Sequence, residues 1–199
     1  MKQRNQILQL AGATSFIQWY DLVCDGENAY GKKFEEHVRS YTARMLMDFT
    51  GNTHMLARPL AIQFLSGLQE NHSREQLTTL RNVGDCSLFL LGFFPNMFKK
   101  KVFSVGYAFD IGRRSYKIVS KSPVFEQSAT RGTFNVYGDL SALFCPLVEL
   151  LQTIREFDGR FTLETRIAME LFEHTGSRKM LKILNSKNII HFKPTTRLQ

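Results

Sequence analysis

The sequence is poor in cysteine and in long apolar runs. Only three cysteines occur in 199 residues, and Cys24, Cys86 and Cys145 stand far apart. An odd number of scattered cysteines argues against a disulfide framework and favours reduced thiols. The longest nearly unbroken apolar run, residues 86–94, is much shorter than the roughly 20 residues that a membrane-spanning helix needs. We therefore expect a soluble, cytoplasmic protein without a membrane span.

The N-terminus lacks the apolar run of a signal peptide. "MKQRNQILQLAGATSFIQW" begins with two cations among its first four residues, but Gln6, Gln9 and Gln18 interrupt its apolar residues. A signal peptide requires an unbroken stretch of roughly 7–15 apolar residues. We interpret this segment as a partly buried helix.

The motifs of common metal, nucleotide and hydrolase sites are also missing. The sequence has no Cys-x-x-Cys pair for zinc, no Glu-x-x-His pair for di-iron, no G-x-S-x-G and no G-x-G-x-x-G. In residues 106–115 the glycine spacing of a phosphate-binding loop is wrong and its lysine is absent. Residues 174–179, "HTGSRK", could hold a phosphate at a helix start, but a helix break with Ser177 as cap explains them better. We expect no metal, no cofactor and no enzymatic activity.

Strand patterns are absent, whereas helical spacing is frequent. In "LRNVGDCSLFLLGFFPNMFKKK", residues 80–101, apolar side chains cover nearly the whole circumference of a helix. A helix that is apolar on nearly all sides is one that neighbouring elements surround. The spacing predicts a central core helix that begins near Ser73 and is ended or kinked by Pro95, whose ring clashes with the preceding turn.

Similar spacing predicts helices within residues 34–51, 58–69, 104–120, 143–159 and 162–188, the last range being broken at Gly176. Leu68 and Phe157 are expected on the apolar stripes, and Ser104 and Ser177 as N-caps. The predicted fold is all-α, a single compact helical bundle of about seven to eight helices that forms one domain over residues 1–199. Residues 120–139 are predicted as a long loop, of a kind that is often functional or mobile, and residues 187–199 as a basic C-terminal tail.

Residues 80–120 contain an ordered set of small, aromatic and proline residues. The set consists of Gly84-Asp85, Leu88-Phe89, Gly92-Phe93-Phe94-Pro95, Tyr107 and Gly112-Arg113-Arg114-Ser115-Tyr116. This segment, about a fifth of the chain, resembles the centre of an uncharacterised family of small bacterial proteins. The resemblance implies an all-helical fold and no particular activity, because none is assigned to the family.

Five positions in this segment are predicted to lock the helices together: Asp85, Gly92, Pro95, Gly112 and Tyr116. The two glycines suit close contacts between helices. Asp85 lies on the core helix, and an unpaired buried charge is costly, so the acid needs a partner. The candidate partners are Arg81, Arg113, Arg114 and Tyr116. A catalytic role for Asp85 is the less favoured alternative.

The net charge of +8 is unevenly distributed. Residues 99–121 hold seven cations against Asp110 alone, and residues 176–199 hold six cations and no acid, so the rest of the chain carries −4. The candidate binding residues are two basic patches, Arg113, Arg114 and Lys117 on one helix, and Arg178, Lys179 and Lys182 on another. Such asymmetry favours an acidic partner, while a solvated basic face that only maintains solubility is the simplest alternative.

The sequence therefore favours a non-enzymatic helical adaptor or chaperone-like subunit, in a bacterial secretion or regulatory complex, that binds an acidic protein segment. The alternative is a nucleic-acid-binding regulator that uses the basic faces. A helical bundle that binds a lipid or small ligand ranks third, because apolar stripes more often form plain core than a pocket.

Overall fold

The computed structural model describes residues 16–51, 59–69, 74–100, 104–122, 135–159 and 161–187. All regular structure in these ranges is helical, and none of the described helices is both long and apolar enough to cross a membrane. The elements are α2 (Phe16–Tyr30), α3 (Glu36–Gly51), α4 (Leu60–Gln69), α5 (Arg74–Phe93), the 3-10 helix η2 (Pro95–Lys100), α6 (Val105–Ser120), α8 (Val136–Ala142), α9 (Phe144–Glu156), α10 (Thr165–Thr175) and α11 (Arg178–Ser186). The predicted all-α fold is confirmed.

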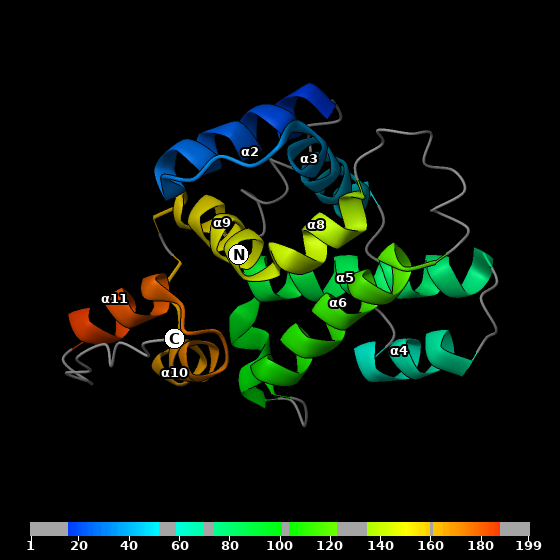
Figure 1. Ribbon diagram of the computed structural model, residues 1–199. Coiled ribbons are helices and arrows are strands. Elements are labelled where there is room, and N and C mark those ends of the chain that lie inside the picture. Colours follow the sequence, from blue (N-terminus) through cyan, green and yellow to red (C-terminus); the bar gives the residue numbers. More distant parts are fainter. Residues whose placement is uncertain are drawn as a thin grey trace, which may run out of the picture.

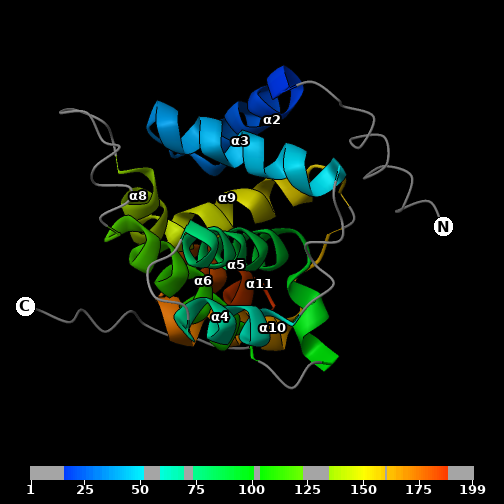
Figure 2. The same cartoon turned by 90° about the vertical axis from the view of Figure 1, so that its right-hand side faces the viewer.

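The helices are stacked in layers (Figures 1 and 2). One outer layer consists of α2 and α3, with α8 and α9 beneath it, then α5 and α6, and finally α4 and α10 on the far side. Helix α5 contacts α4, α6 and α9, and α11 packs on α10. The segment predicted to be the central core helix therefore lies in the middle of the stack.

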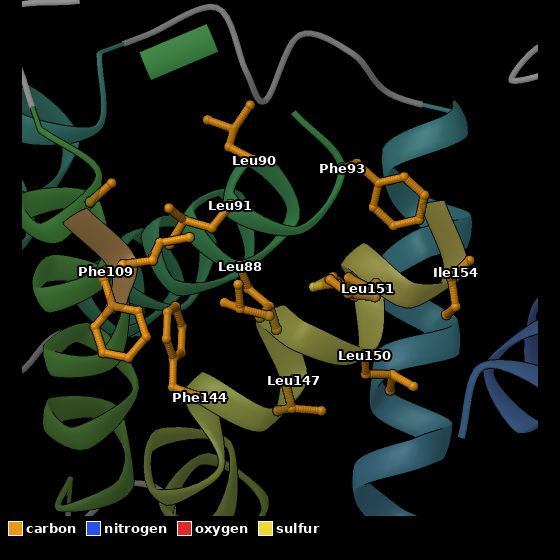
Figure 3. Packing of buried hydrophobic residues seen from close by; sticks show 14 of the residues in the cluster. Leu88, Leu90, Leu91, Phe93, Phe109, Phe144, Leu147, Leu150, Leu151 and Ile154 are labelled. Carbon is orange, nitrogen blue, oxygen red and sulfur yellow. The ribbon is translucent and has the colours of Figure 1, made fainter. Parts of the chain in front are cut away.

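Burial of α5 follows from its composition. Leu80, Val83, Leu88 and Leu91 are fully buried, and Leu88 and Leu91 meet Phe109 of α6 and the leucines of α9 in the main core (Figure 3). Complete burial of one leucine side chain contributes about 1.5–3 kcal/mol. The prediction that neighbours surround this helix is confirmed.

Pro95 ends α5, and a glutamine of α9 compensates for its missing N–H group. The helix ends at Phe93, and the carbonyl of Leu91 would ordinarily accept a hydrogen bond from the residue four positions later. That residue is Pro95, which has no N–H to donate. Nε2 of the buried Gln152 donates to the Leu91 carbonyl instead, at 3.1 Å. The proline thus also determines which side chain α9 must present at this point.

Two predicted N-caps and one predicted helix break are confirmed. The side chain of Ser104 accepts from the Tyr107 N–H, and that of Ser177 accepts from the Met180 N–H. Gly176 has the left-handed backbone, φ 65°, that favours glycine after a helix. These local features are readable from sequence because each depends on only a few adjacent residues.

The predicted loop 120–139 is too long at its C-terminal end. Helix α8 begins at Val136, and the Asn135 side chain caps it by accepting from the Gly138 N–H. Residues 123–134 lie outside the described ranges, as do residues 1–15 and most of the predicted tail. A helix as short as α8 gains little from propensity and depends on packing, so its pattern is weak in the sequence.

Two predicted stripe positions are also wrong. Leu68 and Phe157 are exposed rather than buried. Phe157 is the C-cap of α9 and keeps helical backbone angles, yet 49% of the residue is exposed. Leu68 lies on α4, which is apolar both toward the core and toward solvent.

Candidate functional site

The predicted buried acid, Asp85, lies between helices α3, α5 and α6. Only 8% of Asp85 is exposed, and its Oδ1 atom accepts hydrogen bonds from the hydroxyls of Tyr41 and Tyr116, both at 2.7 Å. Arg81 is more distant, with 4.0 Å between its Nε and Oδ2 of Asp85. Of the four partners predicted for Asp85, Tyr116 is a hydrogen-bonding partner and Arg81 a weak ionic one.

The other two predicted partners, Arg113 and Arg114, are exposed on the outer face of α6 and do not pair with Asp85. Tyr116 lies on the buried side of the same helix. The side chains of Arg113 and Arg114 are exposed, and neither makes an ion pair or hydrogen bond with Asp85. Two of the four candidate partners, the arginines of α6, are therefore wrong.

Burial raises the pKa of Asp85 to about 6, although the hydrogen bonds from Tyr116 and Tyr41 and the charge of Arg81 favour its ionised form. Burial, with the nearby carboxylate, holds the pKa of both tyrosines well above the ordinary value. A carboxyl group with this pKa could exchange a proton near neutral pH. The two tyrosine hydroxyls that donate to Asp85 connect α5 to α3 and α6, and this geometry supports the structural role.

The predicted close contacts of glycine are present between these helices. A Cβ on Gly92 would lie 2.3 Å from Cβ of Leu151 on α9, and one on Gly112 would lie 2.5 Å from Cβ of Ser87 on α5. Gly84, part of the same pattern, leaves room for the Tyr116 ring, which a Cβ would approach to 2.6 Å. The glycines thus allow α5 to approach both neighbours and place the Tyr116 hydroxyl on Asp85.

A second buried acid, Glu149 of α9, was not predicted. Its carboxylate accepts hydrogen bonds from the hydroxyls of Tyr30 and Ser177, which connects α9 to α2 and to the start of α11. The Ser177 hydroxyl therefore donates to Glu149 while it caps α11. A phosphate at "HTGSRK" would face this carboxylate, so the geometry favours the cap.

Ser177→Ala is expected to destabilise the protein by about 2 kcal/mol. The change removes an N-cap, which contributes roughly 1 kcal/mol, and it leaves the buried Glu149 without one donor. The matched control is Ser104→Ala, because Ser104 caps α6 and is exposed. Urea unfolding should show that the Ser104 variant loses only the cap, about 1 kcal/mol. Equal losses in the two variants would contradict the assigned role of Glu149.

A third buried acid connects α2 to α3, and it was not predicted from the sequence. Glu27 is buried, and both of its carboxylate oxygens accept hydrogen bonds from Arg39. The donors are Nε and a terminal nitrogen of the guanidinium group, each at 3.0 Å. The same arginine donates to the Phe34 carbonyl at 3.0 Å. Nothing in the spacing of residues 27 and 39 indicates this pair, because the turn between the helices brings them together.

The first predicted basic patch lies on the outer face of α6. Arg113, Arg114, Lys117 and Lys121 are all exposed, and we call these four residues the α6 basic face. No described carboxylate forms an ion pair with any of them, and Asp110 on the same helix pairs with His174 of α10 at 2.9 Å. Lysines near a helix C-terminus complement the helix dipole, whereas the two arginines lie further from that end. The arginines are thus available to an external anion.

A solvent-open hollow of about 530 Å³ lies along this face. The described residues that line it are Asp110, the α6 basic face and Ile118. Its volume falls in the range of small-ligand pockets, roughly 300–1,000 Å³, but such pockets are mostly apolar and this lining is mostly charged. A second cavity, beside Glu149 and Cys145, has only about 10 Å³ and could hold no more than a water molecule. Neither cavity suits a lipid.

The three cations of the second predicted patch, on α11, do not all face solvent. Arg178 and Lys182 are exposed one turn apart on α11. Lys179 instead points toward α9, where its Nζ donates to Thr153 Oγ1 at 2.7 Å and pairs with Glu156 at 3.0 Å. Two of the three predicted cations therefore remain available on this helix.

The described residues contain no group of three or more His, Cys, Asp or Glu side chains placed to hold a metal ion. Comparisons with known protein families, with curated proteins and with solved structures give no match. The resemblance of residues 80–120 to a bacterial family therefore stays a prediction.

Proposed function

We propose that the protein is a non-enzymatic interaction subunit, an adaptor or chaperone-like component, that binds an acidic segment of a partner protein on the α6 basic face. The observation that carries the proposal is the set of four exposed cations with no carboxylate partner among the described residues. A subunit of this kind would serve in a cytoplasmic, bacterial secretion or regulatory complex.

The side chains of this face favour carboxylates over single-stranded nucleic acid. Arginine presents a planar set of donors that matches a carboxylate, and two of the four cations of the face are arginines. A single-strand platform also needs several exposed aromatic rings on which successive bases stack. On α6 only Tyr107 is exposed, while Phe109 and Tyr116 are buried.

The test compares two charge-reversed variants of the purified protein. Arg113→Glu/Arg114→Glu/Lys117→Glu changes the α6 basic face, and Arg178→Glu/Lys182→Glu changes exposed cations of α11 as the control. We expect a synthetic glutamate-rich peptide to bind the wild type, and to bind the α6 variant at least about tenfold more weakly, a loss of about 1.4 kcal/mol. The α11 variant should bind within about threefold of the wild type, because a nearby but uninvolved charge is largely screened beyond a Debye length of about 8 Å.

The same proteins are then mixed with random duplex DNA and with RNA at about 150 mM salt, where non-specific binders have a Kd of roughly 10⁻⁴–10⁻⁶ M. Sub-micromolar binding of nucleic acid that the α6 variant loses would overturn the proposal in favour of a nucleic-acid regulator. Failure of the acidic peptide to bind the wild type would also overturn it. Circular dichroism should show that both variants keep the helical fold.

A further inference from the structure

Helix α4 has an apolar outer face as well as an apolar inner face. Its sequence, LAIQFLSGLQ, contains no charged residue, and its inner side packs through Phe64 against α5 and α6. On the outside, Ile62, Leu65 and Leu68 are 59%, 56% and 42% exposed. A surface helix usually carries charged or polar residues on its outer face. The three exposed side chains, which we call the α4 apolar face, are therefore suited to contact a partner.

The α4 apolar face and the α6 basic face belong to adjacent helices. Helix α4 contacts α6, and Ile111 and Ile118 of α6 pack in the same small cluster as Phe64. Arg114 comes three residues after Ile111 and four before Ile118, so it lies on the edge of α6 that adjoins α4. Ile118 also lines the hollow along the α6 basic face. In Figure 2, α4 lies in the outer layer of the stack together with α10.

We propose that these two faces form one docking site for an amphipathic helix of the partner, with apolar residues on one side and carboxylates on the other. This inference rests on the proposed function and specifies the form of the acidic segment. Apolar residues of the partner would cover Ile62 and Leu65, and its carboxylates would meet Arg114 and Lys117. Recognition of amphipathic helices in this way uses apolar anchors three and four residues apart.

Other occupants fit these observations less well. Nucleic acid has no apolar side chains to cover the α4 apolar face. In a symmetric dimer each copy presents the same patch, so a second copy would bring one α6 basic face against another. A helix that binds an anionic membrane usually carries Lys and Arg beside its own apolar face, whereas α4 has no charged residue. A partner helix laid along α6 satisfies the apolar contact and the charge together.

The experiment uses three synthetic peptides and the full chain. The first peptide repeats leucine at helical spacing among glutamates, the second has the same composition in scrambled order, and the third contains glutamate but no leucine. We expect the first peptide to bind the wild type at least about tenfold more tightly than the second, as measured by fluorescence anisotropy. Ile62→Ser/Leu65→Ser should remove this preference and leave binding of the third peptide unchanged.

The matched control is Ile17→Ser on α2, in the opposite outer layer. Ile17 is 66% exposed, so this variant also replaces an exposed isoleucine by serine, but far from α4. The Ile17→Ser variant should bind all three peptides as the wild type does. If Ile62→Ser/Leu65→Ser binds all three peptides as the wild type does, the docking site is wrong while the proposed function stands. If no peptide binds the wild type, both fail.

Two further outcomes would assign the α4 apolar face to another occupant. A wild-type dimer in size-exclusion chromatography that Ile62→Ser/Leu65→Ser converts to a monomer would show that a second copy covers it. Flotation with vesicles rich in phosphatidylserine, lost in the same variant while the first peptide shows no preference, would show a membrane surface. Either result overturns the proposed helix.

Discussion

Gly92→Ala is expected to lower the free energy of unfolding by about 2 kcal/mol or more. The new Cβ would lie 2.3 Å from Cβ of Leu151 and 2.9 Å from its Cδ1. A Cβ is fixed to its backbone, so a rotamer change cannot relieve the first contact and helices α5 and α9 must separate. Overpacking of a core typically costs about 1–3 kcal/mol, and a contact this short should cost at least as much as the upper end of that range. The better helix propensity of alanine offsets only about 1 kcal/mol of this cost.

The control for this variant is Gly106→Ala, the same substitution in another helix. There the nearest atom is Nδ1 of His174 at 3.2 Å, on a ring that can shift by a few tenths of an ångström. Its stability should stay within about 0.5 kcal/mol of the wild type in urea unfolding. A Gly92 variant as stable as the Gly106 variant would mean that α5 and α9 do not approach as closely as described.

The sequence allowed prediction of features that depend on a single helix or on a few neighbouring residues. The composition of α5 predicts that it is buried, Pro95 predicts where it ends, and Ser104 and Ser177 predict two helix starts. The close approaches of Gly92 and Gly112 follow in the same way, because a glycine within a core helix indicates that another backbone lies near.

Contacts between distant segments could not be predicted. Tyr41 reaches Asp85 across 44 positions of the chain, and Tyr30 reaches Glu149 across 119. The sequence indicates that a buried acid needs a partner, but helix packing decides which one. The four candidate partners of Asp85 therefore included Tyr116 and Arg81, which lie beside it, and two arginines of α6 that face solvent, but not Tyr41. Glu149, placed among the apolar residues of α9, was overlooked altogether.

The two sides of α6 have separate tasks under the proposed function. Its inner side carries Gly112 and Tyr116, which contact α5, and its outer side carries the α6 basic face. Residues on opposite sides of a helix share few contacts, so their substitutions should act nearly independently. Charge reversal on the outer side is therefore a fair test of binding, because the buried side remains intact.

Asp85→Ala should be less stable than Asp85→Asn by about 3 kcal/mol. Both tyrosine hydroxyls donate to the same oxygen, Oδ1, so the amide oxygen of asparagine can accept both bonds. Alanine leaves two hydroxyls without an acceptor, one of them on the fully buried Tyr116. An unsatisfied buried donor costs roughly 1–3 kcal/mol. Urea unfolding at constant pH measures the difference, and equal stabilities would show that these hydrogen bonds contribute little.

The stability of the wild type relative to Asp85→Asn should fall as pH rises. The pKa of Asp85 is about 6 in the folded state against 3.8 as its ordinary value, so between these values the folded protein binds a proton that the unfolded chain does not. The stabilisation is therefore complete below about pH 4 and is lost as pH rises through 6. A shift of about two units corresponds to roughly 3 kcal/mol between pH 4 and 7.

Subtracting the Asp85→Asn curve from the wild-type curve removes the contribution of the titratable groups that the two proteins share. A difference that rises with pH would mean that the tyrosines and Arg81 hold Asp85 ionised, opposite to the effect of burial. An Asp85→Asn variant that keeps its stability at neutral pH but no longer binds the acidic peptide would assign the acid to function instead. If the carboxyl group is a structural lock, Asp85→Asn should bind the peptide as the wild type does. Tyr116, which donates to Asp85, is on the buried side of α6, whereas the α6 basic face is exposed to solvent.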